Sequence, residues 1–217
     1  ATADEQLRVG KKIAKTFQGW CPIHGITDDT GASIEAEYLE FLRLFDKHLA
    51  AFPYLLGGQP SLGDFAFFGP LYAHLYRDPA SGVLMREAAP QVCDWVIRMN
   101  SFNSQQPFEE HSWVDFESIP DTLSHLLNHL SRDFVPVIVG EVQALQLWLQ
   151  SSSDVIMPRY FGEVDFVIGA GHPHEVCGKR KLTTYGQWMM QRVLNVFEGS
   201  RDRQREKIIQ LFSCFGA

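Results

Sequence analysis

The chain has 217 residues, of which 45% are hydrophobic and 12% aromatic, so it can bury a sizeable core in one large domain or two small ones. Its net charge of −7 is spread along the sequence, and no basic block is longer than residues 179–181. An acidic chain without a clustered basic face is a poor binder of nucleic acid or of anionic membranes. No apolar run approaches the roughly 20 residues that a bilayer span needs.

The cysteines indicate the compartment. Cys21, Cys93, Cys177 and Cys214 are scattered and form no CxxC pair. Cys93 falls inside a predicted helix and no secretory signal is present, so reduced thiols in an intracellular compartment are favoured. The first residues, ATADEQ, lack an initiator Met, as a processed product or a fragment would. An organelle after removal of a transit peptide and the cytosol both remain open.

The first third of the chain is predicted to hold two helices. The first covers residues 4–20, with its apolar side chains mostly on one side. A Gly-, Pro- and Asp-rich loop follows, and Ser33 begins a long amphipathic helix with Glu35 and Glu37 in its first turn, where the helix dipole favours negative charge. The buried stripe of that helix has helical spacing and consists of Tyr38, Phe41, Leu42, Phe45, Leu49 and Phe52.

The stretch PSLGDFAFFGPLYAHLYRD, residues 60–78, is predicted to begin with a capped helix. Ser61 stands three residues before Asp64, so each side chain can bond to the other residue's amide in a capping box. The aromatic run that follows is apolar on all sides and predicts a central, buried helix. Pro70 cannot donate to the carbonyl of Ala66, so the helix should kink or end there and continue in a new direction over residues 71–76.

A further helix is predicted to begin at Pro90 and to run to about Met99, with Val92, Trp95 and Val96 facing inward. The irregular stretch 101–120 then divides the chain into two parts, 1–105 and 106–217. We expect these parts to pack together as one continuous domain.

The second half is again predicted to be mostly helical. Leu123, Leu126, Leu127 and Leu130 form an apolar stripe, and Pro136 is expected to restart the chain into another helix that ends near Gln150. Residues 162–169 alternate apolar and polar side chains, which predicts a strand, and residues 180–184 are expected to pair with it as a short hairpin. Two helices, 185–197 and 201–215, complete a mainly α fold.

The capped helix, the long helix before it and the P-x-x-x-x-W helix after it resemble the core of the C-terminal helical domain of glutathione transferases. Ser61 and Asp64 match the N-capping motif of that family. Residues 68–100, FGPLYAHLYRDPASGVLMREAAPQVCDWVIRMN, are similar to a bacterial and protist branch of the superfamily. The resemblance covers roughly residues 32–100, and the remainder looks like the C-terminal extension of that branch.

The resemblance implies an architecture more than an activity. Such transferases begin with a thioredoxin-like domain, which binds glutathione and carries the activating Tyr, Ser or Cys. In this sequence the helical part begins almost at residue 1, so no residue matches the catalytic position of the family. Glutathione would be a ligand only together with such a domain, and no other cofactor is implied.

Three short patterns suggest redox or metal chemistry. The stretch WCPIHG, residues 20–25, resembles a W-C-x-x-C redox motif, but a helix precedes it and His24 replaces the second Cys, so a loop is favoured. His125 and His129 have a metal-binding spacing, yet they lie opposite the leucine stripe, on a face predicted to be solvated.

The loop GHPHEVCG is the third pattern, and it offers His172, His174, Glu175 and Cys177 as possible ligands. This spacing fits no standard zinc site, and a polar loop is favoured over metal binding. The C-terminal CFGA has the outline of a prenylation box but lacks the aliphatic pair and a polybasic stretch. Phe17 and Trp20 are candidates to border an acceptor pocket or a partner surface.

Two functional hypotheses follow. In the first, the chain is a non-catalytic, transferase-like subunit that binds other protein subunits within a larger intracellular assembly. In the second, it is the helical part of an active glutathione transferase whose glutathione-binding domain lies outside this sequence. The first is favoured, and we expect this chain alone to catalyse no reaction.

Overall fold

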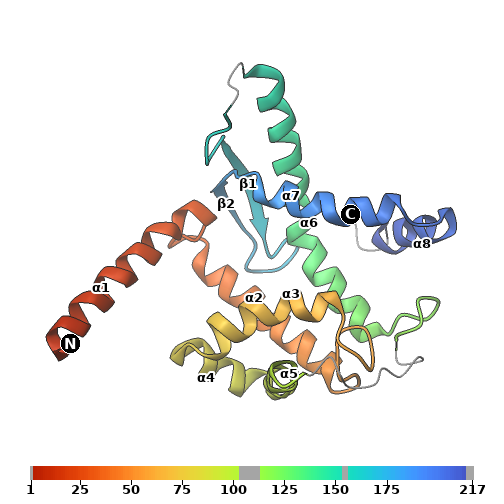
Figure 1. Ribbon diagram of the computed structural model, residues 1–217, viewed down its shortest axis with the longest axis horizontal. Coiled ribbons are helices and arrows are strands. Elements are labelled where there is room, and N and C mark those ends of the chain that lie inside the picture. The colour runs from red at the N-terminus through yellow and green to blue at the C-terminus, as the bar shows by residue number, and fades with distance from the viewer. Residues whose placement is uncertain (1, 103–112, 153–155, 214–217) are drawn as a thin grey trace. The chain divides into compact units, whose positions relative to one another are not determined.

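The computed structural model describes residues 2–102, 113–152 and 156–213, and Figure 1 shows how these segments fold. The described residues form eight α-helices, a short 3-10 helix, a π-helical turn and two strands, which confirms the mainly α class. They divide into two compact units. The helical core unit is Tyr38–Leu130, and the hairpin unit combines Ala1–Glu37 with Ser131–Ala217. The domain boundary expected near residue 105 lies outside the described residues and stays a prediction.

The helical core unit is built around the apolar stripes of two helices. Helix α2 (Gly31–Leu49) contributes Leu42 and Phe45, and α5 (Pro90–Asn100) contributes Trp95, all three with 0% exposure. The rings of Phe45 and Trp95 meet edge to face with centroids 5.1 Å apart, a favourable arrangement for an aromatic pair. Helix α4 (Pro79–Ala88) closes this core with Met85, which is also fully buried.

Helix α3 (Leu62–Pro70) begins at the capping box and presents only one face to the core. Phe67 packs edge to face against Phe41 and Phe45 of α2. Leu62 is 89% exposed and Phe65 is 49% exposed, so the expectation of a helix buried on all sides is wrong. Helix α3 packs against the core on one face, and its opposite face, with Leu62 and Phe65, is not covered by another element among the described residues.

The α-helix ends at Pro70, and a π-helical turn, η2 (Leu71–Tyr76), follows it directly. Pro70 has no N–H group, so the regular hydrogen-bond ladder is interrupted at this position. The Leu71 amide donates to the carbonyls of both Phe67 and Phe68 and carries the chain past the proline. The residues after Pro70 therefore form a wider helical turn.

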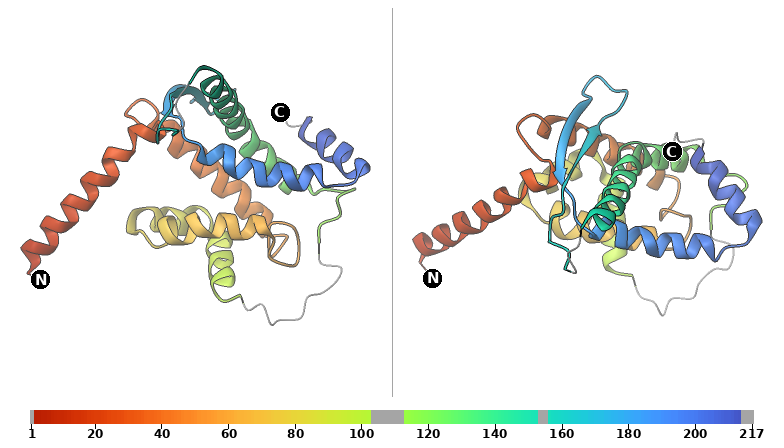
Figure 2. Two further views of the ribbon diagram at one scale, coloured as in Figure 1. Left: turned by 45° about the horizontal axis from the view of Figure 1, so that its top comes forward. Right: turned by 90° about the horizontal axis from the view of Figure 1, so that it is seen from above.

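The hairpin unit contains a two-stranded antiparallel sheet, visible as neighbouring arrows in the right view of Figure 2. Strand β1 (Glu163–Ile168) pairs with β2 (Val176–Lys181), with Glu163 opposite Lys181 and Ile168 opposite Val176. Phe166 is buried at the centre of β1, as its alternating pattern predicts. The second strand begins earlier than expected and ends at Lys181, so only two of residues 180–184 belong to it.

The other elements of the hairpin unit are helical. They are α1 (Ala3–Trp20), the 3-10 helix η1 (Pro22–His24), the first turns of α2, the second part of α6 (Asp121–Ser151), α7 (Tyr185–Glu198) and α8 (Asp202–Ser213). The expected break at Pro136 is absent, because α6 continues through it. Proline costs a helix one hydrogen bond but its own backbone angle is helical, and burial of the adjacent Val137 and Ile138 offsets that cost.

Among the described helices we find none that combines the length and the apolar composition required to span a membrane.

Candidate functional site

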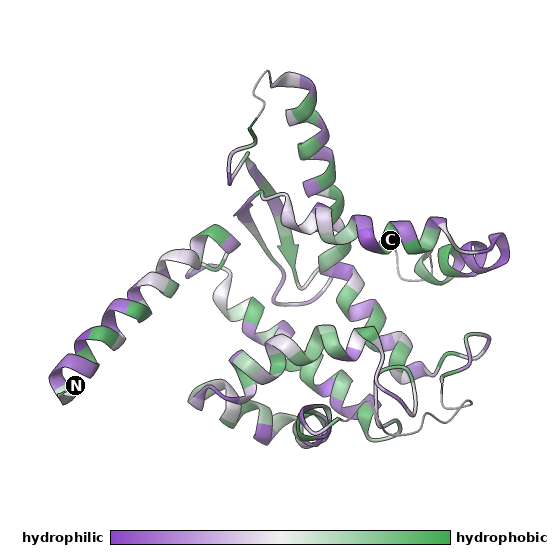
Figure 3. Cartoon of the chain, in the orientation of Figure 1, coloured by the Kyte–Doolittle hydropathy of each residue, from purple (hydrophilic) through white to green (hydrophobic). Residues whose placement is uncertain are grey.

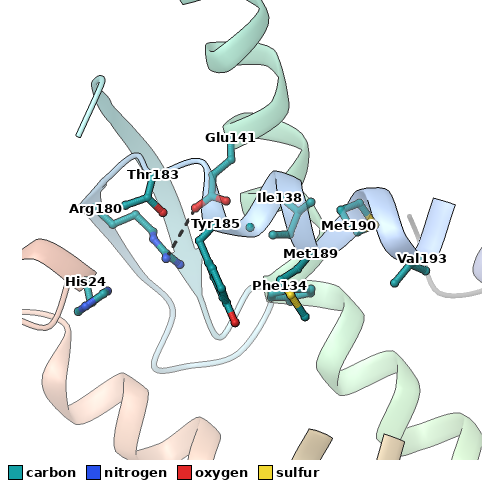
Figure 4. A pocket seen from close by; sticks show the side chains of 11 residues that line it. His24, Phe134, Ile138, Glu141, Arg180, Thr183, Tyr185, Met189, Met190 and Val193 are labelled. Atoms are coloured by element: carbon teal, nitrogen blue, oxygen red, sulfur yellow. Dashed lines mark ion pairs between the residues drawn. The ribbon is translucent and has the colours of Figure 1, made fainter. Parts of the chain in front are cut away.

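A pocket of about 540 Å³ opens in the hairpin unit between α6, the end of β2 and α7 (Figure 4). Its volume lies in the range of small-molecule sites in proteins. Its lining consists of His24, Phe134, Ile138, Glu141, Arg180, Thr183, Tyr185, Gly186, Met189, Met190 and Val193.

Most of the pocket wall is apolar and comes from two helices. Phe134, Ile138 and Glu141 follow one another at helical spacing on α6, so they share one face of that helix. Met189 and Val193 stand four residues apart on α7 and share a face in the same way. Methionine side chains are unbranched and polarisable, so this wall can adapt to apolar groups of different shape.

The polar part of the pocket is the pair Glu141 and Arg180, drawn with a dashed line in Figure 4. The Glu141 side chain is 3% exposed, and its Oε1 lies 3.7 Å from an Arg180 guanidinium nitrogen. Burial raises the pKa of the Glu141 carboxyl above its ordinary value, and the charge of Arg180 opposes that rise. Within the described residues, Glu141 Oε2 and Arg180 Nε are buried and have no hydrogen-bond partner.

Gly186, in the first turn of α7, lies directly against this carboxylate. A Cβ atom at this position would stand 2.1 Å from Glu141 Oε2, far inside van der Waals contact. Glycine therefore lets the start of α7 approach the carboxylate, and any other residue would displace it.

A second group of charged side chains, the Glu37 cluster, consists of Glu37, Arg132, Asp133, His172 and His174. Arg132 donates to Glu37 Oε2, and its Nε donates to Asp133 Oδ1 at 2.9 Å. Glu37 Oε1 lies 2.6 Å from His174 Nε2, and the Arg132 guanidinium lies 2.5 Å from His172 Nε2. These contacts connect α2 and α6 to the loop between β1 and β2.

The Glu37 cluster holds the loop in place. The Gly169 amide donates to Asp133 Oδ2 at 2.8 Å, and Ser33 Oγ donates to the His174 carbonyl at 2.6 Å. Burial raises the pKa of Asp133, but the hydrogen bonds from Arg132 and from the Gly169 amide outweigh burial and lower it overall. Gly169 has a φ of +68°, and a Cβ there would meet the His174 ring at 2.8 Å. The cluster is therefore a scaffold for the hairpin loop.

The loop residues proposed as metal ligands lie in different surroundings. His172 and His174 belong to the Glu37 cluster, whereas Cys177 is exposed on β2 opposite Val167. Glu175 accepts from the Gly171 amide at 2.7 Å. In residues 2–102, 113–152 and 156–213, no three His, Cys, Asp or Glu side chains gather closely enough to hold a metal ion.

The remaining sequence candidates are dispersed. Cys21 and His24 flank the short 3-10 helix η1, which ends at Gly25 with a φ of +79°. His125 is exposed on α6, and His129 is half-buried one turn later. The C-terminal CFGA, residues 214–217, lies outside the described residues.

Phe17 and Trp20 lie at the end of α1, where their rings meet edge to face at 5.0 Å. They are 56% and 46% exposed, and no residue of α1 is buried. Leu7 and Ile13 lie on the same side of this helix, and Figure 3 shows the bands of apolar and polar residues along it. Neither aromatic residue lines the pocket in Figure 4.

Ser61 and Asp64 belong to the interior of the helical core unit. Ser61 Oγ accepts from the Asp64 amide at 3.3 Å, and Asp64 Oδ2 accepts from the Ser61 amide at 2.8 Å. Asp64 is fully buried, and its other oxygen accepts from the Leu55 amide and from Trp95 Nε1. Every oxygen of this carboxylate is bonded inside the protein, so its role is structural.

The comparisons with known proteins agree with this architecture. Residues 28–98 match the family model for the glutathione S-transferase C-terminal domain, in agreement with the family resemblance of this part of the sequence. The match covers about a third of the chain and includes α2, α3, α4 and most of α5. Searches among curated proteins and among solved structures gave no match.

Sequence reasoning missed Glu141 and Arg180, and it did not bring Glu37 and Arg132 together. One signal for Glu141 was present, because it is the single charged residue in the apolar stretch PVIVGEVQAL of α6. A lone carboxylate in such a stretch indicates either an exposed face or a buried polar site. The contacts of Glu37 have no local signal, since Arg132 is 95 residues away in the sequence.

Proposed function

We propose that this chain acts as a non-catalytic, glutathione-transferase-like module that binds another protein within a larger intracellular assembly. The observation that carries the proposal is the exposed apolar face of α1. Leu7, Ile13 and Phe17 are each more than half exposed, and none of the 18 residues of α1 is buried. Most of the stability of a helix in a protein comes from packing of its amphipathic face, and α1 also contains the weak helix formers Gly10 and Gly19. A covering surface would stabilise it.

The other face of α1 indicates the chemistry of its partner. Arg8, Lys11, Lys12 and Lys15 lie on that face, and all four are exposed. A partner groove with an apolar floor and a rim of Asp or Glu side chains would complement both faces of this helix. A protein groove is favoured over an anionic membrane because α1 also carries Asp4 and Glu5 and the chain has a net charge of −7.

The pKa shifts of three side chains in the helical core unit support a non-catalytic role. A lowered pKa is one way in which an enzyme activates a thiol or a hydroxyl. In this unit burial raises the pKa of Tyr38 to about 12, and burial also raises the pKa of Tyr54 and of the Cys93 thiol. These groups therefore ionise less readily than in water.

A second candidate function is the helical half of an active glutathione transferase. The family match of residues 28–98 favours it, because enzymes of that superfamily combine such a domain with a thioredoxin-like, glutathione-binding domain. In that arrangement the apolar face of α1 would contact the glutathione-binding domain, and the activating residue would come from that domain.

Intact mass spectrometry of the native polypeptide, together with an assay of glutathione conjugation, tests the two functions. A native mass near 24.7 kDa and no turnover of an aryl halide by the purified chain agree with the proposed module. A native mass larger by a further domain, with turnover that the 217-residue chain alone lacks, supports the transferase half. Turnover by the 217-residue chain itself would contradict both.

A further inference from the structure

We propose that the pocket of the hairpin unit binds an uncharged amphipathic small molecule. Its hydroxyl or carboxamide end would meet Glu141 and Arg180, and its aliphatic or aromatic body would lie between α6 and α7. This site is separate from the exposed face of α1, so the inference does not depend on the proposed function.

The polar end of the ligand follows from the two atoms left unpaired. Glu141 Oε2 is an acceptor and Arg180 Nε is a donor, and neither has a partner among the described residues. Buried polar atoms of this kind are rare in folded proteins, and leaving them unsatisfied is unfavourable. A group that both donates and accepts would satisfy the two atoms together, and hydroxyl and carboxamide groups have this property.

The charge of the ligand follows from the pairing of the two side chains. Glu141 and Arg180 lie 3.7 Å apart and offset each other's charge (Figure 4). A carboxylate ligand would face Glu141 without compensation, and an ammonium ligand would face Arg180. Because a buried charge without a partner is strongly unfavourable, an uncharged ligand fits this pair best.

The body of the ligand follows from the composition of the wall. Phe134 and Ile138 of α6 and Met189 and Met190 of α7 line this part of the cavity, and Figure 4 labels all four. Burial of aliphatic and aromatic groups against such a surface is favourable, and the favourable free energy grows with the area removed from water. A phenyl or short alkyl group attached to the polar end would therefore contact both helices.

The test uses the full chain with its five methionines labelled with ¹³C at the methyl group. We would titrate it with 4-phenylbutan-1-ol and 4-phenylbutanamide, and with butylbenzene and 4-phenylbutanoate as probes of the same body. The methyl signals of Met189 and Met190 should shift with the alcohol and the amide. Those of Met85 and Met99, buried in the helical core unit, serve as internal controls and should stay in place.

The polar contact is tested with Glu141→Leu, which keeps the approximate volume and removes the acceptor. Hydrogen bonds to charged groups are among the stronger ones in proteins. The wild-type chain should therefore bind the alcohol about tenfold or more tightly than it binds butylbenzene. Glu141→Leu should abolish that preference, whereas Glu87→Leu, at an exposed position of α4, should preserve it. If Glu141→Leu does not fold, Gly186→Ala should weaken alcohol binding by displacing the carboxylate.

Two results would overturn the inference. One is equal affinity of the wild-type chain for the alcohol and the hydrocarbon, which would remove the role of Glu141 and Arg180. The other is a titration in which no probe shifts Met189 or Met190, because the pocket would then bind none of these molecules.

Discussion

Trp95 Nε1 donates a hydrogen bond of 2.9 Å to Asp64 Oδ1, and both side chains have 0% exposure. The same oxygen accepts from the Leu55 amide, and the other oxygen accepts from the amide and the hydroxyl of Ser61. Asp64, the acidic partner of Ser61 in the capping box of α3, therefore also contacts α5 and the segment before α3. One carboxylate links three parts of the helical core unit.

Asp64→Ala should destabilise the protein by about 3 kcal/mol or more, as judged from the free energy of unfolding in denaturant. The substitution leaves the Trp95 indole and the Leu55 and Ser61 amides without an acceptor in a buried site, and each such group is costly. Ser61→Ala removes the cap hydroxyl alone and should cost about 1 kcal/mol.

Asp94→Ala is the matched control, because Asp94 lies on α5 beside Trp95 but is exposed. It should change the free energy of unfolding by no more than about 0.5 kcal/mol. Equal stability of Asp64→Ala and Asp94→Ala would show that the Asp64 bonds do not stabilise the fold.

Local chemistry explains which parts of the fold could be predicted from sequence. The start of α3 and its end at Pro70 depend on residues within a few positions, and the stripe of α5 depends on helical spacing. By contrast, α4 begins at Pro79 without a capping side chain, and it was not predicted. Helix α6 continues through Pro136 because Val137 and Ile138 are buried there. That burial depends on contacts with distant residues, so it cannot be predicted from the local sequence.

The candidate pocket also combines features that the local sequence predicts with features that depend on distant contacts. Its apolar walls have helical spacing on α6 and α7 and can be read from the sequence. The meeting of Glu141 with Arg180 requires the hairpin register and the position of α7, which depend on contacts between distant residues. Likewise the sequence favoured a polar loop over metal binding for the loop histidines, but their contacts with the Arg132 guanidinium and the Glu37 carboxylate could not be predicted from it.

A second prediction concerns His48, which is fully buried on α2. Its Nε2 lies 2.9 Å from the Leu55 carbonyl and its Nδ1 lies 2.9 Å from Thr122 Oγ1. Because a carbonyl only accepts, Nε2 carries the proton and Nδ1 of the neutral ring can accept from Thr122. Burial lowers the pKa of His48 below 6.5, against an opposing effect of the Leu55 carbonyl.

Since the folded pKa lies below the unfolded one, the unfolded chain binds more protons in acid. The stability that His48 contributes is therefore complete above pH 6.5 and is lost as the pH falls through the folded pKa. Unfolding titrations should show this loss in the wild-type protein and a weaker dependence in His48→Gln. His125→Gln, at an exposed position of α6, should retain the wild-type profile, and identical profiles for all three would refute the prediction.

Glu141 should make the stability of the fold depend on pH in the sense opposite to His48. Burial raises its pKa above 4.5, so the folded chain binds more protons than the unfolded one between the two values. The free energy of unfolding should therefore decrease as the pH rises through the folded pKa. Glu141→Gln should remove this decrease, and Glu206→Gln, at an exposed position of α8, should retain it. A Glu141→Gln profile parallel to the wild type would contradict the assignment.

Asp133 tests the role of the Glu37 cluster in positioning the hairpin loop. Asp133→Ala removes the acceptor for the Gly169 amide and one partner of Arg132, at an expected cost of about 1–3 kcal/mol. Hydrogen exchange should become faster in peptides that contain Gly169. Asp165→Ala, whose side chain is 81% exposed on β1, should leave that exchange rate unchanged. Unchanged exchange in Asp133→Ala would mean that the cluster does not hold the loop.

The last prediction concerns the exposed face of α1, which is the part of the molecule that the proposed function requires a partner to cover. In the isolated chain the amides of residues 7–20 should exchange rapidly, because no side chain of α1 is buried and a helix without packing contacts opens readily. In the native complex the same amides should be protected, since Phe17 and Trp20 would lose their solvent exposure. Phe17→Asp should remove that protection by placing a charge in the apolar contact. Phe17→Leu keeps an apolar side chain at the same position of α1 and should preserve the protection. Equal exchange of residues 7–20 in the isolated chain and in the complex would exclude α1 as the docking surface.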